Sequence, residues 1–264
     1  MSNASIKKLN SDTLLCSGGK GEVTKEACLA CALSMNQTCG YDYSLIKIML
    51  SDHERTGIHV TDITGCLRKA WYEKTQTQPE FLHMRAYLLI GNAMHGHLEA
   101  NGDGEVEKKI EAMGLEGTMD IYRDGMIIDT KTTRWLNPEK LPYGSHAMQV
   151  NIYAEMMRSL GHEVKKLFLS YIDMSGPTKC KTCKAVFVPD STGYLSCPRC
   201  HREYSGAHMG AELIQIEQYP REEVQQYINE RRDRLTDSLK TMEAPDREAS
   251  FLCDYCSFKE ICKP

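Results

Sequence analysis

The stretch GTMDIYRDGMIIDTKTT, residues 117–133, decides how the rest of the chain is interpreted. It predicts two short strands around an Asp124-Gly125 turn, because Asp-Gly between apolar runs is the strongest short-range signal for a β-hairpin. If these two residues form the centre of a type I′ turn, counting outward pair by pair sets Asp120 opposite Asp129. The hairpin therefore brings two carboxylates face to face.

A lysine shares this face of the hairpin. Lys131 lies two residues beyond Asp129, and side chains two apart point to the same side of a strand. Two like charges directly across a sheet repel, so the Asp120–Asp129 pair is favourable only with a cation between them. Carboxylates that hold Mg²⁺ or Mn²⁺, with a lysine that positions water, are what phosphodiester hydrolysis needs. A solvent-facing hairpin with scattered charges is the alternative for this segment alone.

Two helix-like segments carry further candidates. In GNAMHGHLEA, His95 and Glu99 share a helical face, so His95 is a candidate nitrogen ligand; a histidine satisfied in the core is the alternative, and His97 competes from another face. Gln149 and Tyr153 are one helical turn apart and are candidates for contacting a DNA strand or supporting the site. An ordinary amphipathic helix is the alternative for this second pair.

These motifs, in this order, resemble those of the PD-(D/E)xK nuclease superfamily, in particular its RecB-type branch. That branch has a GxxxHxxxE helix, an aspartate strand, an acid-x-Lys strand and a QxxxY helix. The matching residues are Gly91, His95, Glu99, Asp120, Asp129, Lys131, Gln149 and Tyr153. Met119 stands where the motif name has proline.

The resemblance implies an α/β fold, a restriction-endonuclease-like central mixed sheet flanked by helices. It also implies Mg²⁺- or Mn²⁺-dependent cleavage of DNA, with His95, Asp120 and Asp129 as metal ligands. The implied catalytic residues are His95, Asp120, Asp129, Lys131, Gln149 and Tyr153.

Twelve cysteines form three sets of four, which favours metal sites over disulfides in a reducing compartment. The central set is CxxC, a 13-residue spacer and a second CxxC, a spacing typical of a zinc ribbon: Cys180, Cys183, Cys197 and Cys200. We expect this ribbon at 176–208 as an insertion between two strands. Its lysines and arginines indicate either contact with DNA or a partner, or merely a solvated surface.

The near-terminal set predicts a second zinc site: Cys16, Cys28, Cys31 and Cys39. His53 or His59 is an alternative for one of these ligands. Because the first 45 or so residues show little hydrophobic periodicity, we expect a metal rather than a core to order them.

The third set joins Cys66 to the C-terminal CxxCxxxxxC motif of Cys253, Cys256 and Cys262. It resembles the four-cysteine iron–sulfur site of the AddB nuclease domain and of the CRISPR-associated Cas-four exonucleases. The resemblance implies a 4Fe-4S cluster that ties the start of the nuclease domain to its end. Four thiolates also suit zinc, and buried thiols without metal are the remaining alternative.

Composition and charge limit the functional classes and the location that fit this sequence. The 264 residues carry a net charge of -4, so any DNA contact requires a local basic surface. No apolar run approaches the roughly 20 residues of a membrane helix, and the N-terminus lacks a secretory signal, so we expect a cytoplasmic protein without membrane contact. We expect an N-terminal zinc-binding module at 1–55 and the nuclease domain at 56–264.

Periodicity and capping signals place the regular elements. We expect helices over 41–50, 61–73, 88–100, 146–160 and 221–242, and strands over 164–172 and 211–219.

The family resemblance implies an exonuclease acting on single-stranded DNA or duplex ends. In the Cas-four branch this activity trims DNA for CRISPR spacer acquisition with an integrase as partner; RecB-like branches act in repair, recombination or phage replication, where a helicase is the partner. The sequence does not choose between these pathways. A catalytically silent DNA-binding or scaffold subunit is the alternative from another class, and a zinc-ribbon transcription or replication factor leaves the hairpin carboxylates unexplained.

Overall fold

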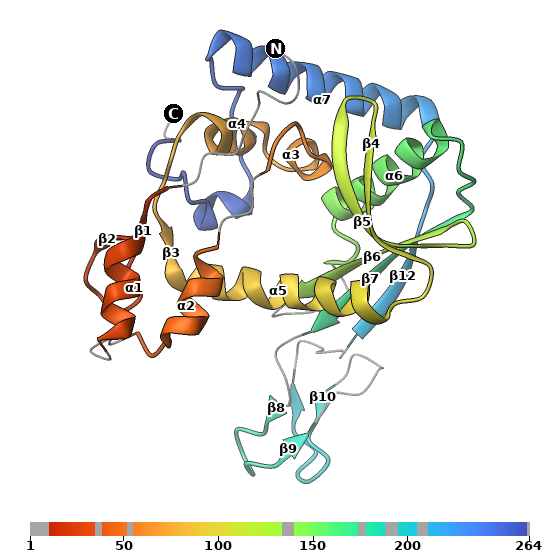
Figure 1. Ribbon diagram of the computed structural model, residues 1–264. Helices are drawn as coiled ribbons and strands as arrows, with labels where there is room; N and C mark the ends of the chain where they lie inside the picture. The colour runs from red at the N-terminus through yellow and green to blue at the C-terminus, as the bar shows by residue number, and fades with distance from the viewer. Residues whose placement is uncertain are drawn as a thin grey trace. The chain divides into compact units, whose positions relative to one another are not determined.

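The computed structural model describes residues 11–34, 39–51, 55–133, 140–173, 178–187, 195–204 and 211–262 (Figure 1). The chain forms two compact units. The first comprises Met1–His97, Gly114–Glu116 and Tyr227–Pro264, and the second comprises Leu98–Met113 and Gly117–Gln226.

The second unit is built on a five-stranded sheet with the strand order β12-β7-β6-β5-β4. Its strands are β4 (Glu105–Ala112), β5 (Leu115–Arg123), β6 (Met126–Thr133), β7 (Lys166–Asp173) and β12 (Ala211–Ile216). β6 and β7 are parallel, whereas β5 pairs with β6 and β7 with β12 in the antiparallel sense. The expected central mixed sheet is thus confirmed, as are the strands expected over 164–172 and 211–219.

The predicted hairpin of β5 and β6 is confirmed with its turn and with its three inner pairs, whereas the direct pairing of Asp120 with Asp129 stays a prediction. Asp124 and Gly125 both have positive φ, 52° and 78°, as a type I′ turn requires. The paired residues are Arg123 with Met126, Tyr122 with Ile127, and Ile121 with Ile128.

Helix α6 (Gly144–Ser159) connects the parallel strands β6 and β7, which cannot be joined by a tight turn and need a crossover. It packs against β4, β6 and β7 (Figure 1). Its buried face includes Val150, Ile152 and Met156, none of them solvent-accessible. The helix expected over 146–160 is confirmed, and it holds Gln149 and Tyr153 against the sheet.

A buried carboxylate anchors the start of α7 (Arg221–Thr241) to α6. Glu155 is 1% exposed, and Arg221 Nη2 lies 2.8 Å from its Oε1. Burial raises the pKa of Glu155, but hydrogen bonds from Arg221 and Gln225 outweigh this and leave the pKa below its usual value. The charge is therefore held inside the unit by specific partners.

The first unit contains the short elements of the N-terminal part and the C-terminal tail. They are β1 (Thr13–Leu15), β2 (Glu22–Thr24), β3 (Glu80–Phe81), α1 (Lys25–Leu33), α2 (Tyr43–Met49), α3 (Val60–Thr64), α4 (Leu67–Thr75) and the 3₁₀ helix η3 (Phe251–Tyr255). Two long helices, α5 (Leu82–Asn101) and α7, begin in one unit and end in the other.

The N-terminal part packs into a hydrophobic cluster that it shares with the start of α5, contrary to the expectation that a metal rather than a core orders it. Leu14, Ile46 and Leu82 are almost fully buried in it, and Cys28 lies among them. The periodicity was weak because each short element contributes only one or two apolar residues, and Leu82 comes from beyond residue 55. The module boundary at residue 55 stays a prediction.

Two other details differ from the sequence-based expectation. The helix expected over 61–73 is interrupted at Gly65, which ends α3 in an extended conformation before Cys66 precedes α4. Strand β4 was not anticipated, because EVEKKIEA is rich in charged residues. The remaining expected helices correspond to α2, α5 and α7, with α5 starting earlier than expected.

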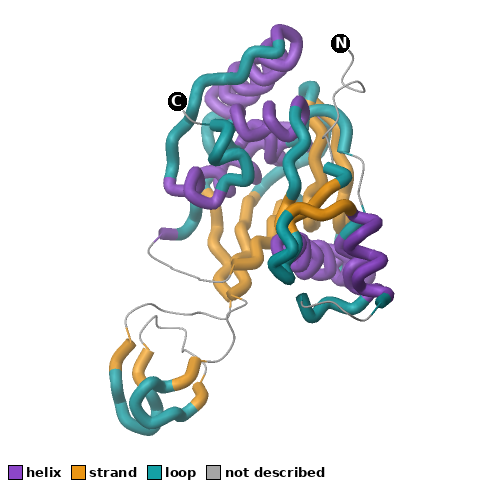
Figure 2. The backbone as a smooth tube through the Cα atoms, turned by 90° about the vertical axis from the view of Figure 1, so that its left-hand side faces the viewer, coloured by secondary structure: helices purple, strands orange, loops and turns teal. Residues whose placement is uncertain are grey.

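The predicted ribbon segment forms two small hairpins (Figure 2). β8 (Thr178–Lys179) pairs with β9 (Val186–Phe187), and β10 (Leu195–Ser196) pairs with β11 (Glu203–Tyr204). Each hairpin carries one CxxC motif in its turn.

Among the helices in the described ranges, none has both the length and the apolar content needed to cross a bilayer.

Replacing Arg221 by methionine tests the ion pair that the half-exposed arginine forms with the buried Glu155. We expect the free energy of unfolding to fall by roughly 1–3 kcal/mol, because the buried Glu155 carboxylate then loses its bidentate charged partner. Urea denaturation followed by circular dichroism measures the change.

The control for this variant is Arg234→Met, which removes an ion pair with the 95% exposed side chain of Asp246. It should change stability by no more than about 0.5 kcal/mol. Equal losses in both variants would contradict the anchoring role of Glu155.

Candidate functional site

The two carboxylates of the hairpin are buried in the second unit, with Asp120 4% and Asp129 1% exposed. Beyond the Ile121–Ile128 pair, Asp120 Oδ2 accepts a hydrogen bond of 2.6 Å from the main-chain nitrogen of Thr130. A side-chain oxygen on β5 therefore accepts a hydrogen bond from the main chain of β6. This contact fixes Asp120 next to the strand that carries Asp129.

Lys131 lies in a polar network that joins β6 to α6. Its Nζ is 2.8 Å from Asp129 Oδ2 and donates to Gln149 Oε1 at 2.9 Å. The amide nitrogen of Gln149 in turn donates to Asp129 Oδ1 at 3.5 Å and to the Tyr153 hydroxyl at 3.1 Å. Four of the six residues predicted to be catalytic thus interact directly. Spacings of two on a strand and four on a helix make this possible.

A buried tyrosine and a histidine flank this network. Tyr171 is the partner of Lys131 in the parallel register of β6 and β7. Its hydroxyl lies 3.0 Å from His146 Nδ1, and burial raises the pKa of Tyr171 to about 12. Burial, together with the positive charge of Lys131, lowers the pKa of His146 to about 4. Both groups are therefore neutral at pH 7, and the charge facing Lys131 is that of Asp129.

Glu107 on β4 is a carboxylate that the sequence analysis did not select. One of its oxygens lies within 4.8 Å of a carboxylate oxygen of Asp120. Its backbone is left-handed, with φ of 47°, a conformation that is uncommon for a residue other than glycine. No local motif marks Glu107, because its position next to Asp120 depends on how β4 lies in the sheet. Oxygen donors from carboxylates suit Mg²⁺ or Mn²⁺, so the residues present fit such an ion.

His95 lies on α5, in the part of the helix that belongs to the first unit, and its side chain is half-buried. Its role as a metal ligand stays a prediction.

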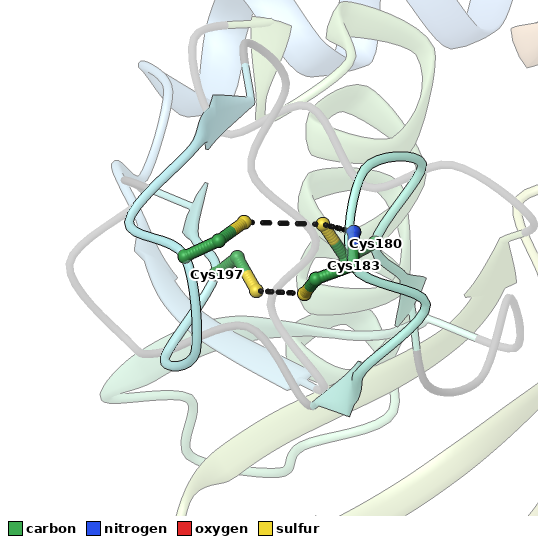
Figure 3. A group of neighbouring side chains, drawn as sticks. Cys180, Cys183 and Cys197 are labelled. Carbon is green, nitrogen blue, oxygen red and sulfur yellow. Dashed lines mark hydrogen bonds between the residues drawn. The ribbon is translucent and has the colours of Figure 1, made fainter.

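The central cysteines come together as their spacing predicts. The sulfur atoms of Cys180, Cys183, Cys197 and Cys200 all lie within 4.8 Å of one another. Figure 3 shows sulfur atoms of the two hairpins facing each other; Cys180 Sγ is 3.6 Å from Cys200 Sγ, and Cys183 Sγ is 3.4 Å from Cys197 Sγ. Four converging thiols are a donor set for zinc or for an iron–sulfur cluster.

The two CxxC turns have the same backbone geometry. In each, the nitrogen of the first cysteine donates to the carbonyl five residues later, Cys180 to Ala185 at 2.8 Å and Cys197 to Arg202 at 2.9 Å. The residue four positions after that cysteine is left-handed in both turns, Lys184 with φ of 61° and His201 with φ of 55°. The repeated turn points each pair of thiols at the other.

The C-terminal tail packs on the helix that follows Cys66. The ring of Phe258 stacks on Tyr72 of α4 with centroids 5.2 Å apart, and the Tyr72 hydroxyl donates to the Ile261 carbonyl at 3.2 Å. The pKa of Arg68 is raised, first by a hydrogen bond with Tyr72 and then by the charges of Cys262 and Cys66. The structure therefore packs the C-terminal end of the predicted cluster motif on the helix that follows Cys66. Among the described residues, the four sulfur atoms of this set are not found converging within 4.8 Å of one another.

The near-terminal cysteines are not among the groups of described residues whose ligand atoms converge within 4.8 Å, but they share one electrostatic environment. Lys20 Nζ donates to Cys31 Sγ at 3.2 Å, and its pKa is raised by Cys31 first and then by Cys16 and Cys39. Burial raises the pKa of Cys28, with the charges of the other three cysteines adding to it.

Two histidines, His53 and His59, are alternative ligands for the near-terminal site, and the structure describes one of them. His59 precedes α3, and its ring Nε2 lies 2.8 Å from the Thr56 carbonyl, so this nitrogen is already engaged there. His53 lies outside the described residues.

A family model for the PD-(D/E)XK nuclease superfamily matches residues 51–263, most of the chain. The chain belongs to the PD-(D/E)XK nuclease superfamily. This PD-(D/E)XK membership indicates a nuclease, and the mixed sheet with flanking helices is compatible with the fold of the superfamily. No curated protein matches the chain. A solved structure described as "Crystal structure of SSO0001" is similar, with a TM-score of 0.46 and 18% identity over 90% of this chain and 95% of that chain.

The pH dependence of stability tests the neutral state of His146. Because its pKa is about 4 in the folded protein and about 6.5 when unfolded, the unfolded state takes up the proton first as pH falls. We expect proton uptake by His146 in the unfolded state to lower the free energy of unfolding by roughly 1–3 kcal/mol as pH is lowered from about 6.5 to 4. His146→Gln should remove that part of the slope, measured by urea denaturation at several pH values.

The exposed His97 provides the control, since His97→Gln should leave the slope unchanged. A His146→Gln variant with the wild-type slope would show that His146 is not buried in its neutral form.

Proposed function

We propose that this nuclease is a Mg²⁺- or Mn²⁺-dependent exonuclease of the RecB type that hydrolyses single-stranded DNA or DNA ends. The observation that carries the proposal is the network of Asp129, Lys131, Gln149 and Tyr153, with Asp120 fixed beside it on the paired strand. An acid and a lysine held together in this way supply what phosphodiester hydrolysis requires.

Each residue has a distinct proposed role. Asp120 and Asp129 hold the cation, and His95 adds a nitrogen ligand on the strength of its motif. When bound, the cation lowers the pKa of a water molecule and stabilises the negative charge that develops on phosphate. Lys131, oriented by Asp129 and Gln149, binds the attacking water or a phosphate oxygen. Gln149 and Tyr153 are positioning residues, since they act through Lys131 and Asp129.

We further propose zinc at the central and near-terminal cysteine sets and a 4Fe-4S cluster at Cys66, Cys253, Cys256 and Cys262. The converging thiols of the ribbon support the first assignment. The packing of the C-terminal tail on α4, the helix that follows Cys66, supports a cluster that links the two ends of the domain. A link between such distant residues stabilises the fold by restricting the unfolded chain.

The proposed partner is DNA, together with either a CRISPR integrase or a DNA helicase. The integrase belongs to spacer acquisition, and the helicase to repair, recombination or phage replication. The genes next to this one distinguish the two pathways.

A cleavage assay with end-labelled single-stranded DNA tests the catalytic assignment. In the presence of Mn²⁺, Asp120→Asn and Lys131→Met should each lower the rate at least about 100-fold, because each removes a group that stabilises the transition state. Lys165→Met is the control, since Lys165 is exposed beside Glu163, and it should retain the wild-type rate. Equal rates in all variants would remove the assignment.

Two further outcomes of this assay are informative. Cleavage of circular single-stranded DNA by the wild type would contradict an exonuclease, which needs a free end. No cleavage of any substrate by the metal-loaded wild type would favour the catalytically silent DNA-binding or scaffold subunit.

Replacing Cys256 by alanine tests the cluster. The variant should lose its iron and its visible absorbance and should melt at a lower temperature, because a structural metal contributes to folding. The neighbouring Ser257→Ala is the control, and its iron content should match that of the wild type. A colourless Cys256→Ala variant with full stability and activity would contradict a structural cluster.

A further inference from the structure

Glu107 is a residue to which none of the nuclease motifs assigns a role. It lies on β4, half-buried, with a carboxylate oxygen within 4.8 Å of one from Asp120. Asp120 is itself almost fully buried. Two carboxylates this close in a partly buried place repel each other when both are ionised, and a cation between them removes the repulsion.

The backbone at Glu107 sets this residue apart from its neighbours on β4. Its φ of 47° lies in the left-handed region. Residues other than glycine rarely adopt this conformation, because it costs free energy. Such a residue interrupts the regular alternation of the strand and changes where its side chain points. Nearby, Glu105 pairs with Lys108 at 2.6 Å on the same strand. Glu105 thus lies beside a lysine, whereas Glu107 lies beside the buried Asp120.

We propose that Glu107 is a further carboxylate ligand of the divalent cation held at Asp120. This inference rests on the proposed function, which places the cation there. Carboxylate oxygens are the ligands that Mg²⁺ and Mn²⁺ prefer, and each additional anionic ligand increases the affinity of such a site. Glu107 therefore extends the site from the hairpin of β5 and β6 to the neighbouring strand β4.

Mn²⁺ binding to the full chain, isolated with its own metals, tests this role without relying on activity. Electron paramagnetic resonance of free Mn²⁺ gives the Kd for wild type, Glu107→Gln, Asp120→Asn and Glu111→Gln. Glu111 is an exposed acid of the same strand and is the matched control. We expect Glu107→Gln to weaken binding about 10-fold or more, since loss of even an outer-shell partner of a metal ligand typically costs that much, and Glu111→Gln to keep the wild-type Kd.

The outcomes separate this inference from the proposed function. If Asp120→Asn loses Mn²⁺ while Glu107→Gln binds it as the wild type does, the role of Glu107 is overturned and the cation site at Asp120 stands. If Asp120→Asn also keeps the wild-type Kd, the proposed cation site itself fails, and the role of Glu107 fails with it.

A second variant serves if Glu107→Gln does not fold. Glu107→Asp keeps the charge but shortens the side chain by one methylene, so the oxygen donor is retracted from the cation. The rise in melting temperature on adding Mn²⁺ should then be smaller than in the wild type. An equal rise would overturn the proposal.

Discussion

The two-residue turn at Asp124-Gly125 is the constraint on which the candidate active site depends. Its positive φ angles match the right-handed twist of the flanking strands, and so they fix the register of β5 against β6. A slip of one residue would turn every side chain of one strand to the opposite face. The register therefore decides that Asp120 lies next to the strand carrying Asp129 and that Lys131 joins Asp129 on one face.

Helix α6 adds two further residues of the candidate site, Gln149 and Tyr153, to those of the hairpin. Because β6 and β7 are parallel, the chain must cross over between them, and the crossover brings Gln149 and Tyr153 over Lys131. Buried charges are costly unless they are paired and hydrogen-bonded. Asp129 meets this condition through Lys131 and Gln149, and Glu155 on the same helix meets it through Arg221. Of the polar groups of α6, Gln149 thus belongs to the candidate site, whereas Glu155 fixes the helix against the start of α7.

The cysteine sets have a different physical basis. Short segments such as the ribbon hairpins contain too few apolar residues to form a core, and small folds of this kind are commonly held by a metal. The two CxxC turns have the same geometry and point their thiols at each other. The near-terminal set differs, since Cys28 lies within a hydrophobic cluster that includes Leu14 and Ile46.

The sequence by itself determined the features that depend on neighbouring residues. Turn chemistry set the hairpin, and spacings of two and four placed Lys131 beside Asp129 and Gln149 beside Tyr153. The CxxC spacing predicted the four central thiols that converge. Only the tertiary structure decided the contacts between distant segments: Glu107 beside Asp120, Arg221 against Glu155, and the tail packed on Tyr72. The physical reason is that local signals fix backbone conformation, whereas charge pairs across strands and helices depend on packing that no short segment encodes.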